Sequence, residues 1–296
     1  MDSTVRRKTA GGIVFDVFNH LLMIFLMFIM LYPFWHVIMA SFSNSNLLSI
    51  HRGALFWPQG FSTKAYQSVL QNMLIWTGYR NTIFVVVVGT ALNLLMTTLG
   101  AYVTSRKNFP IRKPLTVFIM FTMYFSGGLI PSYLLVNNTL NLGNSLWSLI
   151  FPGLISTWNL LIMRTAFFSV PDSIEESAKL DGANDFVILF AIVLPTIKAT
   201  VAVMILFYAV GHWNAWFSAM LYLHKKSKWP LQLVLREIII LSNVQDMLDT
   251  NAPDAESISE TIKYATIIVS SLPILCVYPF LQRYFVKGVM VGAVKG

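Results

Sequence analysis

Long apolar runs dominate the chain, and they predict membrane-spanning helices. A helix needs about 20 apolar residues to cross a bilayer, and six segments reach this length. Each is apolar on all sides, as expected for helices surrounded by lipid or by other membrane helices. The segments are Leu21–Ala40, Thr82–Val103, Leu115–Val136, Leu146–Phe168, Ala199–Leu223 and Ala265–Tyr284. The pattern predicts an all-α membrane protein with six transmembrane helices, formed by residues 1–296 as a single domain.

Composition supports the same class. Charged residues make up 11% of the chain, whereas a soluble domain has about 25%. Hydrophobic residues make up 56%, and the mean hydropathy is +0.64. This composition argues against a disordered chain or a soluble enzyme, because too little polar surface is present to cover the core. The single cysteine, Cys276, excludes an internal disulfide.

The positions of the basic residues predict the orientation of the spans. Lys and Arg concentrate in cytoplasmic links, and four sets of them lie on one side of the predicted bundle. These sets are Arg6, Arg7 and Lys8; Arg106, Lys107, Arg112 and Lys113; Arg164, Lys179 and Lys198; and Arg283, Lys287 and Lys295. We therefore expect both termini to be cytoplasmic and the links 41–81 and 224–263 to be external. The same bias explains the net charge of +8 better than nucleic-acid binding does.

The cytoplasmic link 171–196 is long enough to fold. Ser173 followed by Glu176 matches a capping box at the start of a helix, and Gly182 suits the left-handed residue that ends one. A second helix is expected over Asp185–Leu194, before Pro195 and the fifth span. The apolar contacts of the first helix are expected from Ile174, Ala178 and Leu180.

A motif in this link resembles a known family. Glu176-Ser177-Ala178, Gly182 and Ile192-Val193-Leu194-Pro195 are similar to the E-A-A-x-x-x-G…I-x-L-P consensus of permease subunits of binding-protein-dependent ABC importers. Ser177 replaces the first alanine and is equally small. Asp181-Gly182-Ala183 resembles the maltose-type, carbohydrate-uptake branch. The stretch 124–131 resembles a subgroup that handles oligosaccharide or polysaccharide fragments.

The resemblance implies a type I importer permease fold and a set of partners. These are a second permease subunit in a heterodimer, two ATPase subunits and an extracytoplasmic sugar-binding protein, assembled at a prokaryotic plasma membrane. The helix at 173–183 would couple ATP hydrolysis to transport. The implied coupling residues are Glu176, Ser177, Ala178, Asp181, Gly182, Ala183 and Pro195.

No catalytic or cofactor site is expected in this chain. A phosphate-binding P-loop needs a Gly-Lys dipeptide, and none occurs. ATP and Mg²⁺ would therefore be bound by the ATPase subunits. No H-E-x-x-H motif or Cys/His cluster supports a metal site.

Aromatic and amide side chains in the spans are candidates for the sugar path, because sugars stack on aromatic rings and bond to amides. The candidates are Tyr124, Trp158, Asn159, Trp213, Asn214 and Trp216. The alternative is that each Trp lies at the membrane interface and each Asn bonds a neighbouring helix. Asn93 allows the same two interpretations.

Two other classes of protein were weighed. An ion- or proton-coupled secondary transporter should carry intramembrane charges and paired half-sequences, and the sequence shows neither. A membrane enzyme such as a lipid-linked glycosyltransferase would need acidic groups near a membrane face. Asp172, Glu175, Glu176, Asp181 and Asp185 form such a cluster, but their spacing fits the coupling motif better.

Overall fold

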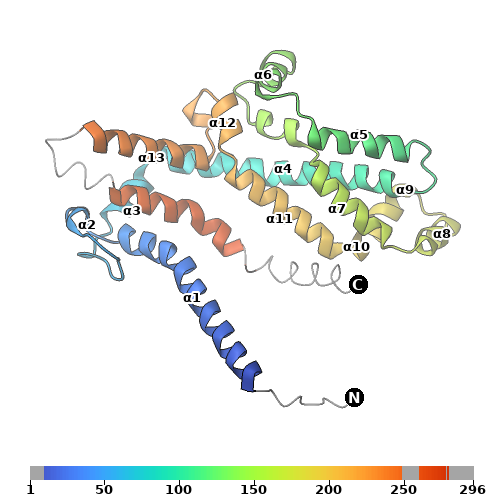
Figure 1. The fold of residues 1–296 in the computed structure, drawn as a ribbon. Helices are drawn as coiled ribbons and strands as arrows, with labels where there is room; N and C mark the ends of the chain where they lie inside the picture. Colours follow the sequence, from blue (N-terminus) through green and yellow to red (C-terminus); the bar gives the residue numbers. More distant parts are fainter. Residues whose placement is uncertain (1–9, 249–259, 278, 280–296) are drawn as a thin grey trace. The chain divides into compact units, whose positions relative to one another are not determined.

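The computed structural model describes residues 10–248, 260–277 and 279, and the regular structure in these ranges is helical (Figure 1). One isolated β-bridge joins Ser43 to Phe61. The chain divides into two compact units, residues 1–71 with 239–269 and residues 72–238 with 270–296. The basic residues at 6–8 and 283–295, part of the external link at 249–259 and the end of the sixth predicted span lie outside the described residues.

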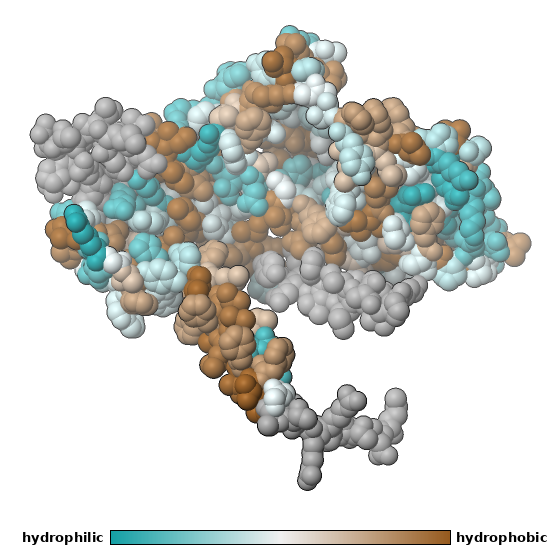
Figure 2. All heavy atoms as spheres, in the orientation of Figure 1, coloured by the Kyte–Doolittle hydropathy of each residue, from teal (hydrophilic) through white to brown (hydrophobic). Residues whose placement is uncertain are grey.

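The first unit is organised around a long apolar helix. Helix α1 (Ala10–Ser41) contains Pro33, and its large apolar side chains between Ile13 and Leu31 are all at least 39% exposed. A helix in water would not leave such a surface uncovered. Figure 2 shows this apolar surface along α1 and hydrophilic residues gathered around α8. The exposed surface of α1 is therefore suited to lipid or to another membrane helix.

The link after α1 folds into short helices, as the length of the link predicts. These are α2 (Ser45–Ile50) and α3 (Lys64–Gln71). Leu55 is buried against Ala40 and Leu48, and its backbone N–H donates to the Tyr32 hydroxyl at 2.9 Å.

The second unit contains most of the chain. Its helices are α4 (Met73–Ser105), α5 (Arg112–Tyr124), α6 (Leu129–Leu134), α7 (Thr157–Phe168), α8 (Asp172–Leu180), α9 (Asp185–Val187), α10 (Leu194–Thr196), α11 (Lys198–Asn214), α12 (Phe217–Tyr222) and the first part of α13 (Leu231–Leu248), whose residues from 239 on belong to the first unit. Short π-helical segments lie at Leu135–Thr139 (η1) and Ile188–Val193 (η4), and short 3₁₀ segments at Leu146–Leu149 (η2), Phe151–Gly153 (η3) and Lys226–Lys228 (η5). A further helix covers Glu260–Val277.

Helix α4 is the centre of this unit, and it packs against α7 and α11 (Figure 1). Apolar residues from these helices form the core near the end of α4. They include Ala101, Tyr102, Leu160, Met163, Phe167 and Met204. The middle of α4 also buries polar side chains, among them Thr90, Asn93 and Thr97. Burial without a hydrogen-bond partner is costly for a polar group; Asn93 and Thr97 have such partners, whereas the Thr90 hydroxyl has none among the described residues.

Within the described residues, three helices are long and apolar enough to cross a membrane, namely Gly11–Ser41, Met73–Ser105 and Glu260–Val277. Three bent pairs of helices also meet the test together. These are Arg112–Tyr124 with Leu129–Thr139 at 110°, Leu146–Gly153 with Thr157–Phe168 at 50°, and Asp185–Thr196 with Lys198–Asn214 at 90°.

The third, fourth and fifth predicted spans are therefore not single helices, which corrects the sequence-based expectation. Gly128 adopts φ +85° where the third run breaks, a conformation that few other residues adopt. Pro152 and Gly153 interrupt the fourth run, and α11 ends at Asn214 within the fifth. Hydropathy records how apolar a segment is, but it does not register these breaks in the backbone.

The break before α7 is held by side chains from two other helices. Asn93 in α4 donates to the carbonyls of Gly153 and Leu154 at 2.7 and 2.9 Å. The Tyr208 hydroxyl in α11 accepts from the backbone N–H of Ser156 at 3.3 Å. Non-helical backbone is tolerated in a membrane bundle where such partners satisfy it.

Candidate functional site

Helix α8 begins earlier than the capping box predicts. Its N-cap is Pro171, no side chain caps it, and Ser173 lies inside the first turn. The capping-box prediction is therefore wrong. Pro171 has the extended backbone of an N-cap residue at φ −60°, ψ 135°, so the helix can begin directly after it. Asp172 and Glu175 place negative charge in the first turn, where the helix dipole favours it.

The end of α8 is a Schellman motif. The N–H of Ala183 donates to the carbonyl of Ala178 at 3.0 Å, and that of Gly182 donates to the carbonyl of Lys179 at 3.1 Å. Gly182 has φ +81°, which confirms the left-handed residue predicted from the sequence. Ala183 packs against the same core as Ala178, completing the apolar contact that accompanies this motif. The short helix is therefore closed firmly at its C-terminus.

The two faces of α8 differ sharply. Ile174, Glu175 and Ala178 face the core of the unit. On the other face, residues three and four apart present a continuous exposed strip. This strip consists of Ser173, Glu176, Ser177 and Leu180.

Leu180 is 89% exposed, so the prediction that it supplies an apolar contact within the chain is wrong. The helix turn carries it to the outer face, beside Glu176 and Ser177. Of the three motif residues at the start of the consensus, Glu176 and Ser177 thus point outward, and Ala178 is buried.

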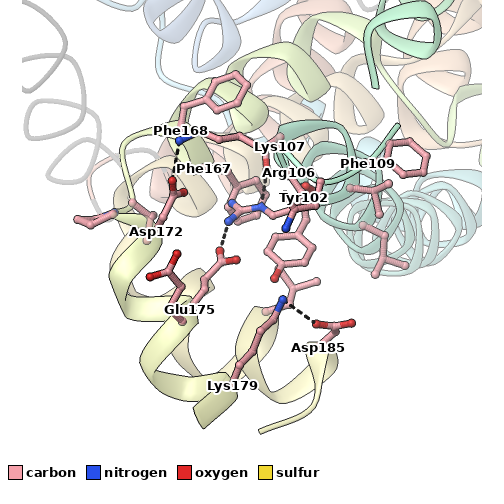
Figure 3. Close-up of a pocket in the computed structure, with 18 of the residues that line it drawn as sticks. Tyr102, Arg106, Lys107, Phe109, Phe167, Phe168, Asp172, Glu175, Lys179 and Asp185 are labelled. Atoms are coloured by element: carbon pink, nitrogen blue, oxygen red, sulfur yellow. Dashed lines mark hydrogen bonds and ion pairs between the residues drawn. The ribbon is translucent and has the colours of Figure 1, made fainter. Parts of the chain in front are cut away.

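An ion pair between Glu175 and Arg106 links α8 to the residue that follows α4 (Figure 3). The Glu175 side chain is 9% exposed and that of Arg106 is 21% exposed. The Arg106 guanidinium also lies 4.6 Å from the centre of the Tyr102 ring, and its Nε donates to Ser105 Oγ at 3.0 Å. Sequence reasoning missed this pair because 69 residues separate its members. The available signal was that Glu175 shares the inward face with Ile174 and Ala178.

Two further ion pairs are exposed. Lys107 Nζ lies 2.6 Å from Asp172 Oδ2, and its hydrogen bond and charge hold the pKa of Asp172 below the ordinary value. Lys179 Nζ lies 3.8 Å from Asp185 Oδ1. Exposed pairs such as these contribute little to stability.

A groove of about 730 Å³ separates part of α8 from the end of α4. Figure 3 shows the ion pairs at this groove together with the rings of Tyr102 and Phe167. The residues that line it come from α4, the end of α7, α8 and the start of the next helix. They include Tyr102, Arg106, Lys107, Phe167, Phe168, Asp172, Glu175, Lys179, Asp185 and Phe186.

The predicted second helix is present. The side chain of Asn184 accepts from the N–H of Val187 at 2.9 Å, and α9, η4 and α10 then run without interruption to Thr196. Pro195 lies exposed near the end of this helix, next to the 90° bend into α11. The second helix therefore connects α8 directly to α11.

The candidates for the sugar path lie on several elements. Trp158 and Asn159 are near the start of α7, Trp213 and Asn214 end α11, Tyr124 ends α5, and Trp216 precedes α12. Asn159 and Trp213 are buried, and the other four are exposed. Trp213 packs near Tyr79, whereas the Trp216 ring lies 3.9 Å below the Arg236 guanidinium. Their role in transport stays a prediction.

The amide of Asn93 is occupied within the protein. Besides its bonds to the broken backbone, its Oδ1 accepts from His212 Nε2 at 2.7 Å. Gly89 gives the His212 ring its space, because a Cβ at that position would lie 2.6 Å from Nε2.

Comparison with known proteins agrees with this architecture over nearly the whole chain. The chain is 40% identical to the polygalacturonan/rhamnogalacturonan transport system permease protein YtcP of Bacillus subtilis, covering 96% of this chain and 99% of that protein. It is also 40% identical to the B. subtilis protein LplC, over 98% and 97%.

A solved bacterial ABC transporter involved in the import of the acidic polysaccharide alginate contains a chain with a TM-score of 0.86 and 31% identity, covering 95% of this chain and 100% of that one. Residues 96–291 match the family described as "Binding-protein-dependent transport system inner membrane component". The protein is therefore a member of this family of membrane permeases.

Proposed function

We propose that this chain is one of two membrane-spanning permease subunits of an ABC importer that brings oligosaccharides or polysaccharide fragments into a prokaryotic cell. Family membership and the two relatives at 40% identity support the permease role. The names of YtcP and of the alginate importer support polysaccharide fragments as the class of substrate.

In this proposal the chain crosses the membrane six times, with both termini in the cytoplasm. The three long helices, the bent pairs at 112–139 and 146–168, and α11 supply the six crossings, while the helix at 185–196 that forms a bent pair with α11 stays in the cytoplasmic link. The basic residues that follow α4 support placing that end, together with α8, in the cytoplasm.

The observation that carries the proposal is the outer face of α8. It combines an exposed leucine, a small residue and a carboxylate on a short helix that is closed by a Schellman motif and anchored on its inner face. Because the other face of α8 packs on the core, a partner can contact this outer face without disturbing the packing of the chain. We assign this face to docking on an ATPase subunit, which would bind ATP and Mg²⁺, while an extracytoplasmic sugar-binding protein delivers the substrate.

Leu180→Glu tests the docking face. The substitution removes no packing within this chain, because Leu180 is 89% exposed. We expect normal membrane insertion, loss of the ATPase subunits from the purified complex and loss of ATP-driven uptake in proteoliposomes. The uptake panel would contain oligogalacturonides, rhamnogalacturonan fragments, alginate oligosaccharides and maltodextrins. Asn108→Glu, at an exposed position outside α8, is the control; unchanged docking in Leu180→Glu would refute the assignment.

Cysteine labelling tests the orientation. After Cys276 is replaced, cysteines at the exposed positions Asn108, Asn138 and Asn184 are introduced one at a time. We expect an impermeant maleimide to label the Asn138 variant in intact cells and to spare the other two. The reverse pattern would place α8 outside the cell.

A further inference from the structure

Helix α8 is attached to the rest of the second unit by two kinds of contact. Its apolar residues pack on the π-helical segment η4 and the core around it. Toward the end of α4, the groove of about 730 Å³ takes the place of continuous apolar packing. Side-chain ion pairs cross this gap, one from Glu175 to Arg106 and one from Asp172 to Lys107.

The Arg106–Glu175 pair is the better defined of the two. Arg106 is fixed on its own side by Ser105 Oγ and by the Tyr102 ring, both within the last turn of α4. Glu175 is nearly buried, whereas the side chains of Lys107 and Asp172 are 74% and 57% exposed. A pair shielded from water resists separation much more than an exposed pair does, because separation leaves an uncompensated charge.

We infer that the Arg106–Glu175 pair transmits displacement of α8 directly to α4. This inference rests on the proposed coupling role of α8. The chain joins α8 to α7 through residues 169–171 and to α11 through the helix at 185–196. Beside these covalent connections, the ion pair adds a second, non-covalent kind of route, directly to the helix at the centre of the bundle. Arg106 and Glu175 are accordingly positioning residues, which act on transport through α4.

Hydrogen bonds from α4 to its neighbours extend this second route to the rest of the bundle. Thr97 in α4 bonds the Tyr208 hydroxyl in α11 at 2.6 Å, and Asn93 holds the broken backbone before α7. A shift of α4 therefore reaches both neighbouring helices through buried hydrogen bonds. The groove leaves room for α8 to change its angle while the ion pair keeps its contact with α4.

The test measures coupling separately from assembly. Arg106→Gln/Glu175→Gln removes both charges without leaving either buried alone, and Arg106→Lys keeps the charge. Lys107→Gln/Asp172→Asn is the matched control at the exposed pair. Each variant is purified with the partner permease and both ATPase subunits. Uptake of the oligosaccharide that the wild type transports fastest, chosen from the panel above, is measured together with ATP hydrolysis.

We expect the double glutamine variant to retain all its subunits and to hydrolyse ATP, but to import about tenfold less sugar per ATP, a typical size for a coupling free energy. The control pair should stay within about twofold of the wild type, and Arg106→Lys should recover most of the ratio. Spin labels at Val187, an exposed position in the helix that follows α8, and at Met96 should show that ATP still displaces the α8 region while the movement of α4 is reduced.

An unchanged ratio of sugar to ATP in the double variant would overturn the inference, as would loss of the ATPase subunits, which would assign the pair to docking. An equal decrease in the control pair would also overturn it, because any ion pair would then suffice. If the wild-type complex itself shows no ATP-driven uptake, the proposed function fails, and this outcome is distinct from the others.

Discussion

The two ends of α4 are joined to the rest of the second unit by different chemistry. At the start, the Asn81 amide donates to the carbonyls of Ser227 and Trp229 at 3.0 and 3.1 Å, and Thr82 Oγ1 accepts from the N–H of Leu231 at 2.8 Å. These neutral bonds reach backbone groups, and Asn81 and Thr82 are almost fully buried. At the far end, charged side chains reach across a groove to α8.

Because of this difference, we expect the attachment at the start of α4 to be rigid and the attachment at its far end to allow movement. Side-chain bonds to backbone atoms have a narrow range of geometry, and Gly78 lets the backbone of Leu231 approach α4 closely. Charge attraction falls off more gradually with distance, so an ion pair holds while its partners rotate. We therefore expect the start of α4 to set the position of the helix and the Arg106 end to follow α8.

The largest expected effect on stability comes from removing Arg106, because its partner is a charged side chain, whereas the partners of Asn81 are backbone carbonyls. Arg106→Met alone leaves Glu175 charged and nearly buried, which should lower the free energy of unfolding by about 2–4 kcal/mol after allowing for the partial exposure of Arg106. Arg106→Met/Glu175→Met should recover most of this loss, because the buried charge is gone. Thermal unfolding of the purified complex, followed as a double-mutant cycle, measures both values.

Asn81→Leu is the corresponding change at the other end. It leaves two carbonyls without their hydrogen-bond donor, which should lower the free energy of unfolding by about 1–3 kcal/mol. No second side-chain substitution can restore it, because the partners are backbone atoms. A double-mutant cycle at the ion pair that is additive, with no recovery, would contradict the interpretation of that end.

A smaller effect on stability is expected when two glycines of α4, Gly78 and Gly100, are replaced by alanine. A Cβ at Gly78 would lie 3.1 Å from Leu231 Cα and 3.3 Å from its N, and these backbone atoms cannot move cheaply. A Cβ at Gly100 would meet only Leu160 Cδ1 at 3.1 Å, the end of a flexible side chain. We expect Gly78→Ala to destabilise the complex by about 1–2 kcal/mol and Gly100→Ala to be neutral or stabilising, since Ala favours a helix over Gly by about 1 kcal/mol. Melting temperatures that fall equally in both variants would show that the two ends are packed alike.

The sequence predicts the helical class, the apolar segments and the helix at α8 because these depend on local patterns. The left-handed Gly182 and the cap by Asn184 follow the same logic, since both act within a few residues. The helix that begins at Leu231 has an apolar face of the same local kind, and Leu231 and Val234 are buried.

What the sequence does not reveal depends on contacts between distant residues. Helix α8 begins before Ser173, the predicted cap, because the extended backbone at Pro171 allows the helix to start directly after it. The hydrophobicity of Leu180 predicts an apolar contact, and only the packing of the opposite face of α8 shows that this side chain points outward. The sequence places Arg106 in a basic link, and its partner Glu175 becomes apparent only when α4 and α8 are brought together.

The smallest expected effect is the pH response of the exposed pair. The hydrogen bond and charge of Lys107 lower the pKa of Asp172 relative to the unfolded chain. A lowered carboxyl pKa stabilises the folded state above the ordinary pKa, and this contribution is lost as the pH falls through the lowered value. The attachment of α8 should therefore be constant from neutral pH down to about pH 4 and should loosen only below it. The mobility of a spin label at Leu180 measures this in the permease without its ATPase subunits, where the docking face is free, with Asp172→Asn as the control that lacks the acid transition. A label at the exposed Ile83, next to Asn81 and Thr82 on α4, should show no corresponding transition, because the bonds from Asn81 and Thr82 contain no titratable group. A transition at both labels would indicate general acid unfolding and would remove the distinction between the two ends of α4.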